Sequence, residues 1–368
     1  MNNNDTVQPF THPGAQQDTG ASDNGVTADE QTPSSKNTPS HAETLENVQA
    51  DLQAQPDAQT NRESDADHAE QPARPAPKKR KRRWGDRSDG RRIRTNPPMA
   101  RVSPYIMKTR LTSCNMFEDV IDMTSIDKYI KEKRMQGNKN ISLMHVLLAA
   151  YARVVSQMPA INRFIAHQEV YTRDGDIWIS LVIKKEMTLE SPDTVVKIHL
   201  TPWVTVDDVA KEITRVVEEY RNAPGGDFDD TAAILNKFPG LFLRFAVGFL
   251  RFLDYFGKIP KKLINLSPFH GSLFITSMGS LGIPTIFHHL YDFGNIPIFL
   301  SFGAKEHKYE LTPEGRVERK SIVKYTIVMD ERICDGFYYA AALKYLRRLL
   351  KNPWLLDSPP ETVVEDID

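Results

Sequence analysis

From residue 116 onward, the pattern of hydrophobic and polar positions switches repeatedly between a period of two and a helical period. Strands are predicted at 116–123, 169–172, 177–183, 194–200, 272–276, 297–303 and 321–330. Helices are predicted at 126–135, from Ser142 to Pro159, from Thr205 to Tyr220, and at 241–256 and 337–350. Strands that alternate with helices in this way predict an α/β fold.

Local signals set the limits of two helices. Ser125 is expected to cap the helix at 126–135, whereas Ser142 begins the next helix and Pro159 ends it. This second helix has few polar positions, so we expect it to be buried. Its His145 is therefore interpreted as a hydrogen-bonded core histidine and not as a ligand.

A tight turn is predicted where Asp174-Gly175 separates two strand-like runs. The Asp-Gly pair is a strong signal for a β-hairpin, because both residues tolerate positive φ angles. We therefore expect the strands at 169–172 and 177–183 to pair with each other.

The helix at 241–256 carries a phenylalanine at every third or fourth position, namely Phe242, Phe245, Phe249, Phe252 and Phe256. This spacing places the five rings on one face. One interpretation is a helix that lies in the plane of a membrane, or the wall of an acyl-chain channel. The other, which we favour because a phenylalanine stripe usually serves packing, is a helix buried in a core or oligomer interface.

Charge is strongly segregated along the chain, although the net charge is only −1. Residues 1–77 carry 13 acidic and 3 basic side chains, and Phe10 is their only aromatic residue. Residues 78–94 carry 10 basic and 2 acidic side chains. The composition predicts a disordered acidic tail over 1–77 and a basic linker over 78–94.

The basic linker has two interpretations. A run of consecutive cations can bind anionic lipid or nucleic acid. Alternatively, it is a solvated linker that pairs loosely with the acidic tail, because opposite charge blocks on one flexible chain attract each other.

Several classes of protein are disfavoured. The polar N-terminus has no apolar segment typical of a secretory signal, and no apolar run is long enough to span a membrane. Two cysteines, Cys114 and Cys334, predict neither a disulfide framework nor a zinc cluster. We expect no metal and a cytoplasmic location, with the membrane periphery as an alternative.

Five segments, in order, resemble one enzyme family. They are Phe117–Thr124, Ser142–Asn162, Phe274–Gly282, Ile298–Lys305 and Met329–Gly336. Together they are similar to the acyltransferase (E2) catalytic domain of 2-oxo acid dehydrogenase complexes, which is related to chloramphenicol acetyltransferase. The resemblance implies a catalytic domain over 95–357, followed by an acidic C-terminal tail over 358–368.

The resemblance also implies an architecture. The expected fold is that of the coenzyme A-dependent, chloramphenicol acetyltransferase-like enzymes, a two-layer α/β sandwich with a mixed sheet and helices on one face. It implies a homotrimer or a higher homo-oligomer, with coenzyme A as substrate and an active site between subunits.

The site residues follow from the same resemblance. The family signature Asp-His-Arg-x-x-Asp-Gly matches 330–336, with Glu331 at the place of the catalytic histidine. Asp335 is expected to hold the turn that presents residue 331. Ser277 is our candidate for the hydroxyl that donates to the oxyanion, and Thr276 and Ser280 are rivals.

The glutamate changes the chemistry. In water a thiol has a pKa near 8.5, a histidine near 6.5 and a glutamate near 4.3, so a carboxylate is the weaker base. Burial in a dry site can close much of this gap. The alternative is that Glu331 is a structural carboxylate paired with a cation such as Arg332, in an inactive relative.

Other reactive side chains are weaker candidates. His288 and His289 follow the Ser-Leu-Gly-Ile-Pro turn and are assigned to substrate binding, although adjacent histidines on a loop usually lie at a surface or interface. His270 is a further candidate, and Cys334 has no neighbouring base that the sequence identifies.

The predicted function is that of an E2-like acyltransferase that moves an acyl group between coenzyme A and an unidentified acceptor. No lipoyl attachment domain is recognised in this chain, so the acceptor would be a separate acyl-carrier or lipoyl protein. The alternatives are an inactive E2-like trimeric scaffold and a peripheral membrane protein that handles acyl chains.

Overall fold

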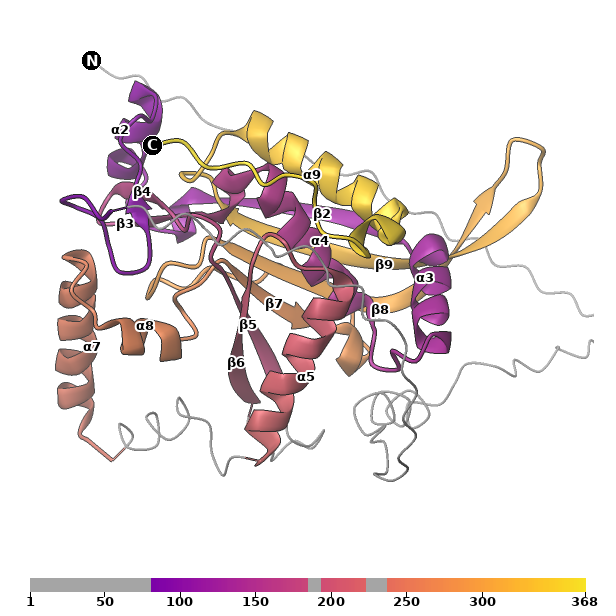
Figure 1. Ribbon diagram of the computed structural model, residues 1–368, viewed down its shortest axis with the longest axis horizontal. Coiled ribbons are helices and arrows are strands. Elements are labelled where there is room, and N and C mark those ends of the chain that lie inside the picture. The colour runs from indigo at the N-terminus through magenta and orange to yellow at the C-terminus, as the bar shows by residue number, and fades with distance from the viewer. Residues whose placement is uncertain (1–80, 185–192, 223–236) are drawn as a thin grey trace, which may run out of the picture.

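The computed structural model describes residues 81–184, 193–222 and 237–368 (Figure 1). The predicted acidic tail and the start of the basic linker lie outside the described residues. Within them, no helix is both long enough and apolar enough to cross a membrane.

The central element is a mixed sheet of six strands. Its order is β2 (Cys114–Asp122), β9 (Val317–Asp330), β8 (Ile298–Leu311), β7 (Leu273–Ser277), β5 (Ile177–Lys184) and β6 (Asp193–Leu200). β7 runs parallel to both of its neighbours, and all other pairs are antiparallel. β2 and β6 are the edge strands, and the outer halves of β8 and β9 project from the domain as a hairpin (Figure 1).

A second, three-stranded sheet consists of β1 (Arg91–Arg92), β4 (Glu169–Thr172) and β3 (Arg163–Ala166), with β4 in the middle. The predicted hairpin between 169–172 and 177–183 is therefore wrong, because β4 and β5 belong to different sheets. The turn signal itself is real, since Asp174 and Gly175 have φ angles of 49° and 94°. The turn passes the chain from one sheet to the other.

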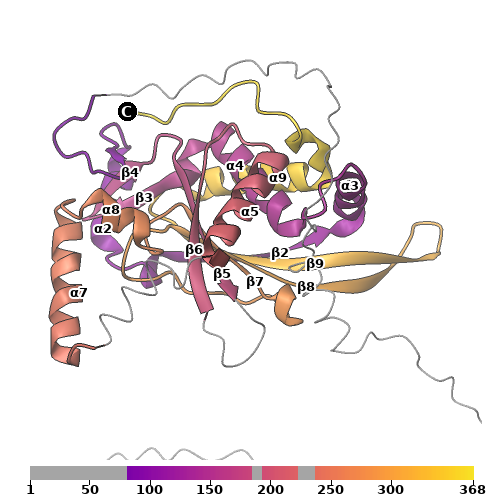
Figure 2. The same ribbon diagram turned by 60° about the horizontal axis from the view of Figure 1, so that its bottom comes forward.

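Four helices cover one face of the large sheet (Figure 2), which confirms the predicted α/β fold with a mixed sheet and helices on one face. They are α3 (Met123–Met135), α4 (Leu143–Gln157), α5 (Val206–Asn222) and α9 (Gly336–Lys351). The remaining α-helices are α2 (Pro98–Ile106), α7 (Gly240–Tyr255) and α8 (Lys261–Leu266). α7 and α8 lie beyond the sheet, at one end of the molecule (Figures 1 and 2).

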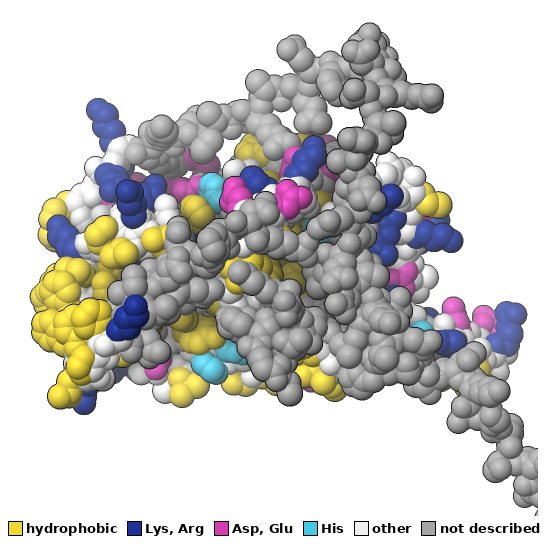
Figure 3. Space-filling model, turned by 90° about the horizontal axis from the view of Figure 1, so that it is seen from below, with side chains coloured by type: hydrophobic (Ala, Val, Ile, Leu, Met, Phe, Trp, Pro, Cys, Tyr) yellow, Lys and Arg dark blue, Asp and Glu magenta, His cyan; other side chains and the backbone are white. Residues whose placement is uncertain are grey.

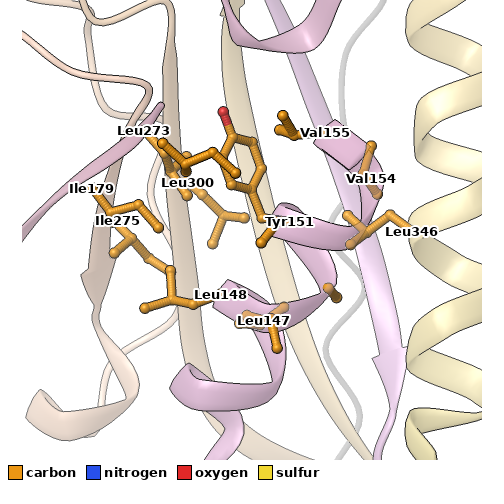
Figure 4. Packing of buried hydrophobic residues seen from close by; sticks show 14 of the residues in the cluster. Leu147, Leu148, Tyr151, Val154, Val155, Ile179, Leu273, Ile275, Leu300 and Leu346 are labelled. Carbon is orange, nitrogen blue, oxygen red and sulfur yellow. The ribbon is translucent and has the colours of Figure 1, made fainter. Parts of the chain in front are cut away.

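The hydrophobic core lies between α4 and the sheet. Leu148 and Tyr151 of α4 point toward Ile179, Ile275 and Leu300 of the strands (Figure 4). On the other side, Val154 of α4 approaches Leu346 of α9 (Figure 4). As predicted, α4 is buried, because both the sheet and its neighbouring helices need its apolar surface.

Side chains at the helix starts explain where two helices begin. Ser142 precedes α4, and its backbone N–H donates to Nδ1 of the buried His145 at 3.1 Å. The interpretation of His145 as a core histidine is thus confirmed. The predicted cap at Ser125 is wrong, because Asp122 accepts a bond from the Thr124 N–H and α3 starts at Met123.

The second half of the basic linker is part of the folded domain. Arg87 and Arg91 are buried, and Arg91 pairs with Asp174 at 2.7 Å and with Asp368 at 3.1 Å. The C-terminal residue Asp368 also accepts from Arg83 at 2.8 Å. Acidic groups of the described domain, Asp174 and Asp368, therefore neutralise part of this basic segment.

The helix-free face of the sheet carries a smaller apolar cluster. Phe274 and Phe299 stack with ring centroids 4.8 Å apart, and Val328 completes the row. The chain between β7 and β8 returns over them. Its Thr285 hydroxyl contacts the Thr326 hydroxyl at 2.9 Å, which fixes this connection to β9.

Candidate active site

The turn from Asp330 to Gly336, at the end of β9, is fixed by a buried ion pair. The Arg332 guanidinium donates to both carboxylate oxygens of Asp330, at 2.8 and 2.6 Å. A third donor of Arg332 reaches the Met107 carbonyl at 2.8 Å. The alternative in which Arg332 pairs with Glu331 is therefore wrong, since its donors are taken by other groups.

Glu331 lies at the surface of this turn and is partly exposed. Its backbone N–H donates to the Ser113 carbonyl at 2.9 Å, which joins the turn to the start of β2. Within the described part of the chain, its carboxylate makes no ion pair and no hydrogen bond. The carboxylate is thus held in position by its backbone and is available to a further group.

Asp335 closes the turn. Its side chain accepts from the Tyr338 N–H at 2.9 Å and caps the start of α9. A carboxylate at this place also meets the positive end of the helix dipole. Cys334, between the two acids, is an unsuitable nucleophile, because burial raises the pKa of its thiol to about 12.

The candidate hydroxyls lie at the end of β7. The Ser280 N–H donates to Ser277 Oγ at 3.3 Å, and Ser280 Oγ donates to the Ser277 carbonyl at 2.8 Å. Ser277 and Ser280 therefore form one small turn, in which Ser277 is partly exposed. Thr276 precedes them and is 9% exposed.

His288 and His289 stack on each other with ring centroids 4.6 Å apart. His288 also lies flat on Phe299 at 3.9 Å, and Phe299 pairs with Val328 in the sheet. Burial lowers the pKa of His288, which favours its neutral form. The two rings cover the helix-free face, while His289 remains exposed.

Strand pairing shows that the candidate groups are spread along the sheet. Ser277 lies beside Phe302, which lies beside Tyr325 on the antiparallel strand β9. Glu331 follows Tyr325 by six residues on that strand, a separation of about 20 Å at the usual rise per residue. A single copy therefore does not bring Ser277 and Glu331 together.

Sequence reasoning missed two arginines near the turn, the buried Arg110 and the half-buried Arg163. The buried Arg110 guanidinium donates to the Tyr291 carbonyl at 2.8 Å and also binds the Gly294 carbonyl. Arg163 pairs with Asp366 at 2.5 Å and reaches the Ile333 carbonyl at 3.5 Å. Nothing in the local pattern distinguishes these arginines from surface cations, because their partners come from distant parts of the chain.

A second buried polar cluster lies beside α7. Arg87 pairs with Asp254 at 2.5 Å and with Asp89 at 2.9 Å. His270 Nε2 lies 3.7 Å from the same Asp254 carboxylate, and Asn295 donates to Asp89 at 2.7 Å. Burial alone would raise the pKa of Asp254, but His270 and Arg87 hold it well below its usual range. His270 thus belongs to this cluster and not to the turn at 330–336.

Among the described residues, no group of three or more histidine, cysteine or acidic side chains is placed to hold a metal ion.

No protein-family model matches the sequence, and no curated protein matches it. Solved structures with a similar fold are found, at low sequence identity.

Three of these structures are acyltransferases or their cores. A probable dihydrolipoamide acetyltransferase from Listeria monocytogenes is 15% identical, with a TM-score of 0.43 over 70% of this chain and 94% of that chain. A truncated catalytic core of the 2-oxoacid dehydrogenase multienzyme complex from Thermoplasma acidophilum is 13% identical, with a TM-score of 0.42 over 71% and 98%. A chloramphenicol acetyltransferase is 11% identical, with a TM-score of 0.44 over 71% and 100%.

Proposed function

We propose that the chain is a coenzyme A-dependent acyltransferase whose active site forms between two copies. The observation that carries the proposal is the position of the two candidate groups, Glu331 at the end of β9 and Ser277 at the other end of the sheet. The resemblance of 330–336 and 274–282 to E2 segments implies that they act in one site. A ring of copies, such as a homotrimer, brings opposite ends of the sheet together and completes that site.

In the proposed reaction the thiol of one partner attacks the thioester carbonyl of the other. Glu331 accepts the thiol proton as the sulfur–carbon bond forms. The Ser277 hydroxyl of a neighbouring copy donates to the oxyanion of the tetrahedral intermediate. As the intermediate collapses, the leaving thiolate takes the proton back from Glu331, so that the acyl group has moved between coenzyme A and the acceptor.

The turn itself does not strengthen Glu331 as a base. Because Arg332 neutralises Asp330, the nearest acid does not disfavour the charged form of Glu331. The partial exposure of Glu331 in one copy means that the second copy must exclude water from it. A carboxylate gains strength as a base only when it is shielded from water. The acceptor would be a separate acyl-carrier or lipoyl protein.

The test combines two inactive variants, Glu331→Gln and Ser277→Ala, and follows thiol release from acetyl-coenzyme A with a small thiol acceptor. Each variant alone should lose at least about 100-fold in activity. When the two chains are co-expressed and purified together, an inter-copy site regains both groups in about one quarter of random pairings. Recovery near that fraction supports the proposal, whereas no recovery from the mixed oligomer contradicts a site shared between copies.

Ser280→Ala is the matched control, because Ser280 lies in the same turn as Ser277. It should keep most of the activity. If Ser280→Ala loses activity and Ser277→Ala keeps it, the hydroxyl that donates to the oxyanion belongs to Ser280 and not to Ser277.

The alternative is an inactive E2-like scaffold, and the presence of Glu331 at the position of the family histidine favours it. Under this alternative, coenzyme A does not bind, and the mixed oligomer forms without turnover. Binding of coenzyme A in calorimetry, together with turnover that Glu331→Gln abolishes, would rule it out.

A further inference from the structure

In the segment from Lys237 to Ser267, called here the α7–α8 segment, the large apolar side chains of α7 point outward. No residue of α7 is buried against the described residues. Leu241 is 82% exposed and Phe245 is 71% exposed. The exposed set on α7 and its C-terminal end includes Leu241, Phe242, Phe245, Phe249, Phe252 and Phe256. Figure 3 shows hydrophobic side chains gathered at this end of the molecule, with lysines and arginines at their margin.

Polar groups near the C-terminal ends of α7 and α8 contact the domain. Asp254, the only acid between 237 and 267, pairs with Arg87 at 2.5 Å. At the other end, the Lys197 ammonium of β6 donates to the Ile264 and Ser267 carbonyls at 2.8 and 3.1 Å. The segment is therefore attached to the domain by ionic and polar contacts near Asp254 and Ser267 and by the buried Ile259 and Ile264 that follow α7.

This arrangement is the reverse of an ordinary surface helix, which turns its apolar face to the core. Among the described residues nothing buries the phenylalanine stripe, so the core interpretation is wrong, whereas burial in an oligomer interface stays a prediction. With 16 residues, α7 is about 24 Å long at the usual helical rise, too short to cross a bilayer. An apolar environment that accepts such a helix lengthwise is a bilayer interface.

Charge identifies the kind of surface. Between Lys237 and Lys262 the chain carries six cations and one acid, a net charge of +5. Within the described part of the chain, Arg244 and Arg251 on α7 make no ion pair. The acidic N-terminal tail has opposite charge but only one aromatic side chain, Phe10, to set against the phenylalanines. A second copy of α7 would bring like charges together.

We propose that α7 lies in the plane of an anionic phospholipid membrane, with its phenylalanines among the acyl chains and its arginines at the phosphates. The contact at Asp254 then holds the domain at the membrane by the C-terminal end of the helix. This inference stands apart from the acyltransferase proposal, since it rests on a different part of the molecule.

The test is co-sedimentation of the full chain with phosphatidylcholine vesicles, with and without phosphatidylglycerol. The wild type should bind vesicles that contain phosphatidylglycerol. Phe245→Ala with Phe249→Ala should weaken that binding at least about tenfold, because two exposed rings lose their apolar contact. Arg244→Gln with Arg251→Gln should remove most of the preference for the anionic lipid.

The control is Tyr309→Ala with Leu311→Ala, which removes two side chains that are 66% and 74% exposed on the β8–β9 hairpin. It should bind as the wild type does. All variants keep the basic run at 78–83, so that run cannot account for a difference between them. Absence of binding by the wild type, or equal binding by the phenylalanine variant, overturns the proposal. The proposal is also overturned if the wild type does not bind vesicles and the phenylalanine variant forms a smaller oligomer than the wild type without lipid. α7 would then be a contact between copies.

Discussion

Two helices of almost equal length, α4 and α7, differ completely in how many of their residues are buried. α4 has 15 residues and buries 12 of them, whereas α7 has 16 residues and buries none against the described residues. Both sequences are rich in apolar side chains and poor in charge. The comparison shows that apolar content alone does not decide whether a helix enters the core.

Position in the topology explains the difference. α4 lies over the middle of the large sheet, between α5 and α9, so all of its sides meet other elements. α7 comes between α5 and β7 in the sequence and lies beyond the end of the sheet, so none of the described strands lies beneath it (Figure 2). Its polar residue Asp254, and not its phenylalanines, joins it to the domain.

The difference in burial between α4 and α7 is tested most directly by shortening one side chain on each helix. Leu148→Ala on α4 removes a side chain that is 0% exposed and should lower the free energy of unfolding by about 2–5 kcal/mol. Phe249→Ala on α7, where the ring is 51% exposed, should change it by less than about 0.5 kcal/mol. Urea unfolding of both variants measures this. Equal losses would mean that α7 is also packed in the folded protein.

A second prediction concerns how α7 is attached. Asp254→Asn removes the negative partner of Arg87, whose side chain is 2% exposed, and should lower the free energy of unfolding by about 2 kcal/mol. Hydrogen exchange should become faster in α7 and stay slow in α4. Unchanged exchange in α7 would show that its other contacts are sufficient to hold it.

The third prediction uses pH to probe α4. Burial lowers the pKa of His145 to about 4, whereas an unfolded histidine titrates near 6.5. The folded state therefore binds fewer protons between these values, and its stability is complete above pH 6.5 and is lost as the pH falls toward 4. His145 should account for a loss of about 1–2 kcal/mol between pH 7 and pH 5.

The matched variant is His145→Gln, which keeps a side chain able to accept the Ser142 N–H and removes the titration. Unfolding curves at pH 7 and pH 5 should show a smaller difference for this variant. Part of the dependence remains, because burial also lowers the pKa of His167 and His270. An unchanged difference would place the acid sensitivity elsewhere.

Much of the fold follows from local patterns in the sequence. Most strands and helices from 114 to 351 were predicted within a few residues, because periodicity and helix caps act over short distances, whereas β3, α8 and the outer half of β8 were missed. Ser142 and the buried helix behind it are an example. Asp122 was missed as a cap because Ser125, three residues later, carries a similar signal.

What the sequence did not predict depends on distant partners. The Asp-Gly turn was correctly located, but only tertiary packing decides that β4 and β5 join different sheets. Likewise, Arg332 pairs with Asp330 and not with its other neighbour Glu331, because in that buried position its guanidinium also donates to the Met107 carbonyl. The motifs identified Ser277 and Glu331, whereas their separation along the sheet became visible only with the strand register.

The edge strand β2 has a consequence for how copies of this protein can meet. Among the described residues, one side of its backbone has no partner strand, and it carries Glu118, Asp119 and Asp122 along its length, of which Asp119 pairs with Arg347. Side-by-side pairing of two such edges would align carboxylates of like charge, which sheet proteins use to prevent edge-to-edge aggregation. The sheet is thereby protected against growing into a continuous β-structure, and self-association is directed to other faces of the domain.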